Sequence, residues 1–176
     1  MTVVQSELSW LAAGRARIGT HEIKGVKHNP LIVSMWEVAF QATNQKTWIR
    51  DDETAWCGAF AGYCIAKGSD PKKIPKDFYR AKSWAEAGTS LSKPAYGCVV
   101  VFSRSGGGHV GFVVGKDQRG NIMVLGGNQS DAVNIKPFST DRVIAYRWVG
   151  TQKLPLASRY NLPVLNSDGK VSTNEA

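Results

Sequence analysis

The chain has 176 residues, a length that fits one domain with a real hydrophobic core. Its formal net charge of +8 favours anionic partners. The basic residues are scattered in short groups, such as Lys72 and Lys73, and neither a dense basic helix nor an aromatic RNA-binding motif occurs, so we expect no nucleic-acid partner. We also expect no membrane span, because the chain has no apolar run of about 18 residues.

The chain has three cysteines but no paired cysteine framework, which argues against a disulfide scaffold. We expect Cys64 and Cys98 to pack in the core, as most free cysteines do. There is no C-x-x-C motif, and His21 and His28 would need metal ligands from an unrelated part of the chain. We therefore expect no metal and no cofactor, and we expect a monomer.

The first half of the chain is predicted to be helical. Apolar spacing predicts helices over residues 7–16 and 29–42, the second with Asn29 as N-cap and Pro30 at its first position. After a loop that contains two prolines, residues 81–87 are predicted to form a further short helix.

A cysteine stands near the start of another predicted helix, which Thr54 is expected to cap and which is expected to end at Gly68. Cys57 falls in the first turn, where unpaired backbone N–H groups and the helix dipole favour a thiolate. Glu53 ends a run of three acidic residues that opposes this effect, so a cationic partner is needed. The alternative for Cys57 is a small buried side chain without chemistry.

The second half of the chain is predicted to form strands. These cover residues 99–102, 109–114, 122–125 and 143–148. Helices first and a sheet after them make an α+β arrangement. Prolines beyond Gly150 and a polar end over residues 166–176 predict an extended tail with disorder at its terminus. We therefore expect one domain over residues 1–150 and a tail over residues 151–176.

A histidine begins the second of these strands. Centring the following turn on residues 118–119 places His109 opposite Asn128 in an antiparallel pair. The same register pairs Val114 with Met123 and Phe112 with Leu125. A carboxamide opposite the imidazole would accept a hydrogen bond from one ring nitrogen and orient the other toward a thiol. An early helical cysteine followed by a strand histidine thus predicts a hydrolase with a cysteine nucleophile.

These motifs together resemble a known family. The chain is similar to phage- and bacterium-associated peptidoglycan hydrolases close to the CHAP and NlpC/P60 groups of papain-like cysteine amidases and endopeptidases. The resemblance runs from about Trp10 to Trp148. It is carried by residues 16–25, 29–32, 52–57, 81–84, 88, 108–112 and 125–129. The chain departs from the family at Gly97 and Cys98, where the family usually has Gly-Asp.

The resemblance implies an α+β papain-like fold and a thiol mechanism. The catalytic residues that it implies are Cys57, His109 and Asn128. The residues from which we expect substrate contacts are Glu53, Trp56, Trp84 and Gln129. For the two tryptophans core packing stays open as the alternative, and for Glu53 helix capping does.

The implied substrate is peptidoglycan, cut at an amide bond of the stem peptide. The bond is either the lactyl to L-alanine bond or one within the peptide. The N-terminus lacks the pattern of a secretory signal, so we expect synthesis in the cytoplasm and delivery to the wall by holin-dependent release, as for a phage endolysin, or by a secretion apparatus. Two alternatives remain, namely a non-catalytic envelope-binding or virion structural module, and a thiol acyltransferase.

Overall fold

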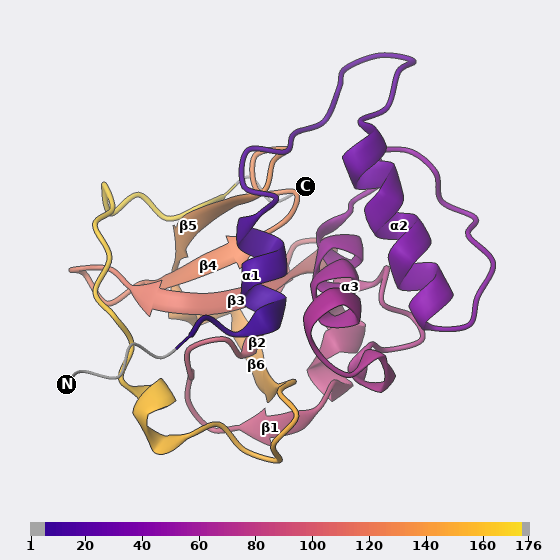
Figure 1. Cartoon of the computed structure of the whole chain (residues 1–176). Helices are drawn as coiled ribbons and strands as arrows, with labels where there is room; N and C mark the ends of the chain where they lie inside the picture. Colours follow the sequence, from indigo (N-terminus) through magenta and orange to yellow (C-terminus); the bar gives the residue numbers. More distant parts are fainter. Residues whose placement is uncertain (1–5, 174–176) are drawn as a thin grey trace.

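The computed structural model of the protein describes residues 6–173. Figure 1 shows helices gathered on one side of a twisted sheet, which confirms the predicted α+β fold. The helices are α1 (Ser9–Arg15), α2 (Pro30–Ala42) and α3 (Cys57–Gly68). The strands are β1 (Thr89–Leu91), β2 (Val99–Arg104), β3 (Gly107–Lys116), β4 (Ile122–Gly126), β5 (Asn134–Phe138) and β6 (Val143–Trp148). Short 3-10 segments are η1 (Pro71–Lys73), η2 (Ala81–Glu86), η3 (Thr140–Arg142) and η4 (Ala157–Tyr160).

Helix α2 begins as its sequence predicts. The Asn29 side chain accepts a hydrogen bond from the backbone N–H of Leu31 at 2.9 Å, and Pro30 is the first helical residue. A carboxamide that satisfies an otherwise unpaired N–H stabilises the helix start, and proline costs nothing there because its missing N–H would have no partner.

The sheet has the order β1-β6-β2-β3-β4-β5, and all of its strand pairs are antiparallel. The predicted pairing of Phe112 with Leu125 is confirmed. The register shifts between Val113 and Gly115, so that Gly115 lies opposite Met123 and the predicted pairing of Val114 with that residue is wrong. Strands β1 and β5 were not predicted.

Helix α3 is the centre of the core. It contacts β3 and β4 on one side, while α2 packs on its other side (Figure 1). The ring of Phe60 meets the ring of Phe112 edge to face, with centroids 6.4 Å apart. Both side chains are fully buried. Packing of this kind fixes the first turn of α3 against the strand that carries His109.

The segment after η1 crosses the first turn of α3 at very short range. A Cβ on Gly58 would collide with the carbonyl oxygen of Phe78, so only glycine allows this approach. The crossing brings residues 79–82 alongside Cys57.

Gly58→Ala is expected to lower the free energy of unfolding by on the order of 1–3 kcal/mol, because backbone must move to admit the methyl group. Urea denaturation of the variant beside the wild type measures this loss. Gly107→Ala is the matched control, since the nearest atom to its added Cβ would be Arg104 Nε at 3.8 Å. Equal losses in both variants would contradict the close approach.

The chain beyond Gly150 runs back along the β3–β4 hairpin. Val164 forms a parallel bridge with Lys116, and the hydroxyl of Ser167 donates to Asp117 Oδ2 at 2.9 Å. Residues 166–173 therefore have defined positions, and the end of the predicted disordered terminus, residues 174–176, lies outside the described residues. Within residues 6–173, no helix is long and apolar enough to cross a membrane.

Candidate active site

Cys57 is the first residue of α3, and Trp56 is its N-cap. The prediction that Thr54 caps this helix is wrong, because the Thr54 hydroxyl donates to Asp51 Oδ2 at 3.0 Å. The other oxygen of Asp51 accepts hydrogen bonds from the backbone N–H groups of Glu53 and Thr54. Asp51 thus closes a separate turn before the helix. The helix then begins at the cysteine itself, with the thiol at its N-terminal end.

Burial raises the pKa of the Cys57 thiol, which is 4% exposed. Hydrogen bonds from the backbone of Val110 and Gly58 and the positive charge of Arg104 act in the opposite direction. Desolvation therefore outweighs the helix-start effect predicted from the sequence. The contact with Val110 places the thiol against β3 at the residue that directly follows His109, and Arg104 is the nearby cation that the sequence left unidentified.

His109 lies on β3 and is fully buried. Its Nε2 is 3.0 Å from Oε1 of Gln129. The amide nitrogen of Gln129 donates to the carbonyl oxygens of Val124, at 3.2 Å, and Asn134, at 3.1 Å. Because the amide nitrogen of Gln129 donates to these two carbonyl oxygens, its amide oxygen faces the imidazole. An amide oxygen can only accept, so His109 Nε2 is the donor and carries the proton of the neutral ring. Nδ1 is then the basic nitrogen of His109.

Two phenyl rings and a glycine complete the surroundings of the imidazole. The ring of Phe138 lies nearly parallel to that of His109, at 6° and 5.4 Å between centroids, and the ring of Phe102 lies at 26° and 6.1 Å. A Cβ on Gly126 would collide with Oε1 of Gln129. The glycine therefore leaves the space in which the amide oxygen reaches the histidine.

The predicted pairing of His109 with Asn128 is not among the pairs of the β3–β4 ladder. Strand β4 ends at Gly126, and Asn128 has a left-handed backbone with φ 58°. This turn interrupts the alternation of side chains on which the prediction depended. Asn128 is fully buried. Gln129, which was expected to contact substrate, is instead buried with its side chain bonded to His109.

A cavity of about 440 Å³ opens at Cys57, within the usual range for small-ligand sites. Its lining includes Cys57, Tyr79, Arg80, Lys82, Arg104 and Gly108. These residues come from the start of α3, the segment into η2, the end of β2 and the start of β3. The thiol therefore has access to a space that a substrate can enter.

The remaining predicted substrate residues lie outside this cavity lining. Trp56 and Trp84 are fully buried, and their indole nitrogens donate to Glu22 Oε1 and to the Phe78 carbonyl, each at 2.9 Å. Both tryptophans therefore pack in the core, which is the alternative left open above. Glu53 is exposed in the loop before α3. It does not cap the helix, since the cap residue is Trp56.

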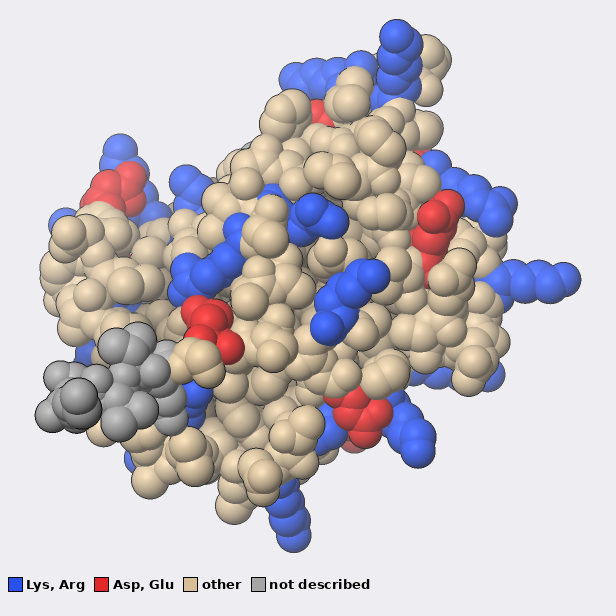
Figure 2. Space-filling model, viewed as in Figure 1, with Lys and Arg blue, Asp and Glu red and all other residues tan. Residues whose placement is uncertain are grey.

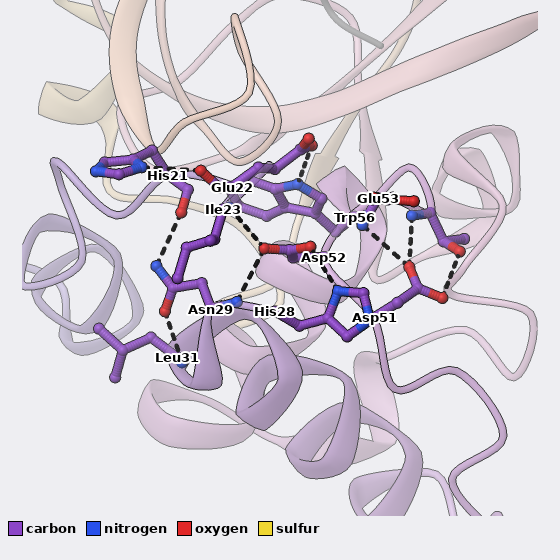
Figure 3. A network of polar contacts seen from close by, with 11 residues as sticks. His21, Glu22, Ile23, His28, Asn29, Leu31, Asp51, Asp52, Glu53 and Trp56 are labelled. Carbon is purple, nitrogen blue, oxygen red and sulfur yellow. Dashed lines mark hydrogen bonds and ion pairs between the residues drawn. The ribbon is translucent and has the colours of Figure 1, made fainter. Parts of the chain in front are cut away.

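An acidic residue of the run that ends at Glu53 connects two loops near the start of α3. Asp52 is fully buried and accepts hydrogen bonds from the backbone N–H groups of Ile23, at 2.8 Å, and Asn29, at 2.9 Å. Its other oxygen lies 2.9 Å from Nδ1 of His28. Figure 3 shows these contacts joining the loop between α1 and α2 to the loop that precedes Cys57.

The ion pair within this network makes stability depend on pH. The hydrogen bond to Asp52 raises the pKa of His28. Burial opposes ionisation of Asp52, but hydrogen bonds from Ile23, Asn29 and His28 prevail and lower its pKa. The contribution of His28 to the free energy of unfolding is complete below the ordinary histidine pKa of about 6.5. This contribution is lost as the pH rises through the raised pKa of the folded state. The contribution of Asp52 to the free energy of unfolding is present above the ordinary aspartate pKa of about 3.9. This contribution is lost as the pH falls through the lowered pKa of the folded state.

His28→Gln is therefore expected to destabilise the protein at pH 6 but progressively less as the pH rises above neutrality. Urea denaturation of wild type and variant over a pH series measures the difference in free energy of unfolding. His21→Gln serves as the control, because the His21 ring contacts the backbone carbonyl of Glu22. A difference for His28→Gln that stays constant from pH 6 to pH 9 would contradict the ion pair.

A cysteine at a helix start, next to a strand that carries a buried histidine held by a carboxamide, is the arrangement of papain-like cysteine peptidases. The model of the CHAP domain matches residues 10–128 of the chain. The chain therefore belongs to the CHAP domain family, a family of peptidoglycan hydrolases of the papain-like type. Comparison with curated proteins and with solved structures finds no match. Gln129 directly follows the last matched residue.

Proposed function

We propose that the protein hydrolyses an amide bond of the peptidoglycan stem peptide, as an N-acetylmuramoyl-L-alanine amidase or an endopeptidase, with Cys57 as nucleophile and His109 as base. Two contacts carry this proposal. The thiol of Cys57 contacts the backbone of Val110, and the imidazole of the preceding residue, His109, contacts Gln129. The sequence predicted Asn128 as the third member of the triad. We assign that role to Gln129, because its oxygen contacts Nε2.

Acylation begins when Nδ1 of His109 takes the thiol proton as Sγ attacks the carbonyl carbon. The raised pKa of Cys57 favours this concerted transfer over a preformed thiolate. Gln129 keeps the Nε2 proton in place and stabilises the imidazolium that forms. The backbone N–H of Cys57, at the helix start, supplies part of the oxyanion hole.

Collapse of the tetrahedral intermediate breaks the C–N bond. The imidazolium gives its proton to the departing amine, which leaves a thioester on Cys57. A water molecule then loses a proton to His109 and attacks the thioester, and the thiol takes the proton back as the carboxylic acid departs. Hydrolysis of this kind suits a lytic protein, either a phage endolysin or an effector delivered to the wall.

Incubation of purified sacculi with the protein, followed by mass spectrometry of the soluble fragments, tests the function. We expect new amine termini in stem peptides, whose position identifies the bond that is cut. Sedimentation of the protein with sacculi without any fragments would instead indicate an envelope-binding or virion structural module. Fragments joined to an added amine would indicate the acyltransferase alternative.

A further inference from the structure

The lining of the cavity that contains the thiol includes three residues with cationic side chains. Arg80 and Lys82 come from the start of η2, and Arg104 comes from the end of β2. The Arg104 Nε donates to the carbonyl of Gly108 at 3.2 Å, and the stem of Lys82 lies directly over Gly108. Figure 2, by contrast, shows lysine and arginine side chains on one face of the molecule spread apart among uncharged residues.

Within residues 6–173, none of these three side chains forms an ion pair with an aspartate or glutamate within 4.0 Å, and the polar partner of Arg104 Nε is a neutral carbonyl. Arg15 with Glu7 and His28 with Asp52 form ion pairs elsewhere in that range. No aspartate or glutamate from that range lines the cavity. Three like charges around one cavity repel one another, and an anion that binds there is attracted by all three. Unbalanced cations beside the nucleophile thus indicate an anionic group on the substrate.

We propose that this cavity binds a free carboxylate of the substrate, held by Arg80 and Lys82, close to the amide bond that Cys57 attacks. The proposal rests on the peptidase function proposed above and narrows its substrate class. Stem peptides provide such a group, since a glutamate linked through its side chain keeps its α-carboxylate free. Tyr79 supplies an aromatic wall beside the charged groups. The same stem peptide with that carboxylate amidated is then a poor substrate.

A matched pair of synthetic muropeptides tests the proposal, one with the free α-carboxylate and one with the α-amide. For wild type we expect kcat/KM to be about tenfold or more higher on the carboxylate form, as for a charge-assisted hydrogen bond. In the double variant Arg80→Gln with Lys82→Gln, this ratio is expected to fall close to one. Lys24→Gln with Lys27→Gln is the matched control, because it removes the same charge from an exposed loop and should keep the ratio.

Equal kcat/KM values for the two muropeptides in wild type would overturn the proposal, and so would a preference that persists in the Arg80 and Lys82 double variant. Cleavage of neither peptide would refute the proposed hydrolase function but not carboxylate binding. In that case, calorimetric titration of Cys57→Ala with both peptides tests whether the cavity binds the carboxylate. Tighter binding of the carboxylate form that disappears when Arg80 and Lys82 are also replaced supports the site, and equal binding of the two forms refutes it.

Discussion

Cys57→Ala is expected to abolish release of soluble fragments from sacculi while leaving the fold intact. In the proposed mechanism this side chain supplies the nucleophile, and alanine cannot form the thioester. The start of α3 has no side-chain capping hydrogen bond, so the substitution removes none. Mass spectrometry of the soluble fraction measures the activity, and far-UV circular dichroism with a urea midpoint confirms the fold.

The other two cysteines provide matched controls. Cys64 and Cys98 are fully buried, and burial raises the pKa of Cys64 well above its ordinary value and that of Cys98 to about 12. Neither lines the cavity at the head of α3. Cys64→Ala and Cys98→Ala should stay active and lose about 1 kcal/mol of stability through the small spaces they leave. An inactive, folded Cys98→Ala beside an active Cys57→Ala would disprove the assignment of the nucleophile.

Local signals in the sequence predict the helices and the central strands, but they fail for the two strands at the edges of the sheet. β1 has three residues, which is too short to show a period. β5 contains Pro137, which argues against a strand because proline lacks the N–H that a ladder needs. The structure tolerates it since β5 is an edge strand. Edge position is a property of the assembled sheet, which no local pattern contains.

The contact between His109 and Gln129 was not predicted, for a related reason. A register prediction assumes that side chains alternate without interruption, yet the ladder shifts after Val113 and the chain turns left-handed at Asn128. The carboxamide of Gln129 then reaches Nε2 of the ring. The adjacent Gly126 and Gly127 allow irregular backbone at this point. A pair of glycines does not by itself predict that Gln129 reaches the ring.

The cations at the cavity could not be predicted from the sequence. Arg80 and Lys82 lie more than twenty positions before Arg104, in a different kind of element. They meet because the chain crosses α3 at Gly58 and because η2 then packs against β2 and β3. Such a meeting is set by tertiary packing. Similarity to a family supports proposing a nucleophile and a base, but it carries no information on side chains particular to this chain.

His109→Ala and Gln129→Ala are expected to lower activity to different degrees. In the proposed mechanism the imidazole moves a proton in every step, so its loss should lower kcat by roughly 10²–10⁴-fold. In the proposed triad Gln129 is a positioning residue whose neutral hydrogen bond is worth about 1 kcal/mol, so its removal should cost roughly fivefold in kcat with little change in KM. Steady-state kinetics on a soluble muropeptide separates the two parameters. Urea midpoints show whether each variant remains folded.

The pH profile distinguishes an orienting role for Gln129 from a merely structural one. The amide oxygen of Gln129 accepts a hydrogen bond from Nε2–H of His109 and so stabilises the imidazolium. Removal of this acceptor should therefore lower the pKa of His109. The acid limb of the kcat/KM profile, which reports that base, is therefore expected to move to lower pH in Gln129→Ala. Asn128→Gly is the control, because glycine tolerates the φ of 58° while removing the carboxamide. If Asn128→Gly moved the acid limb and Gln129→Ala did not, the triad would be the one predicted from the sequence.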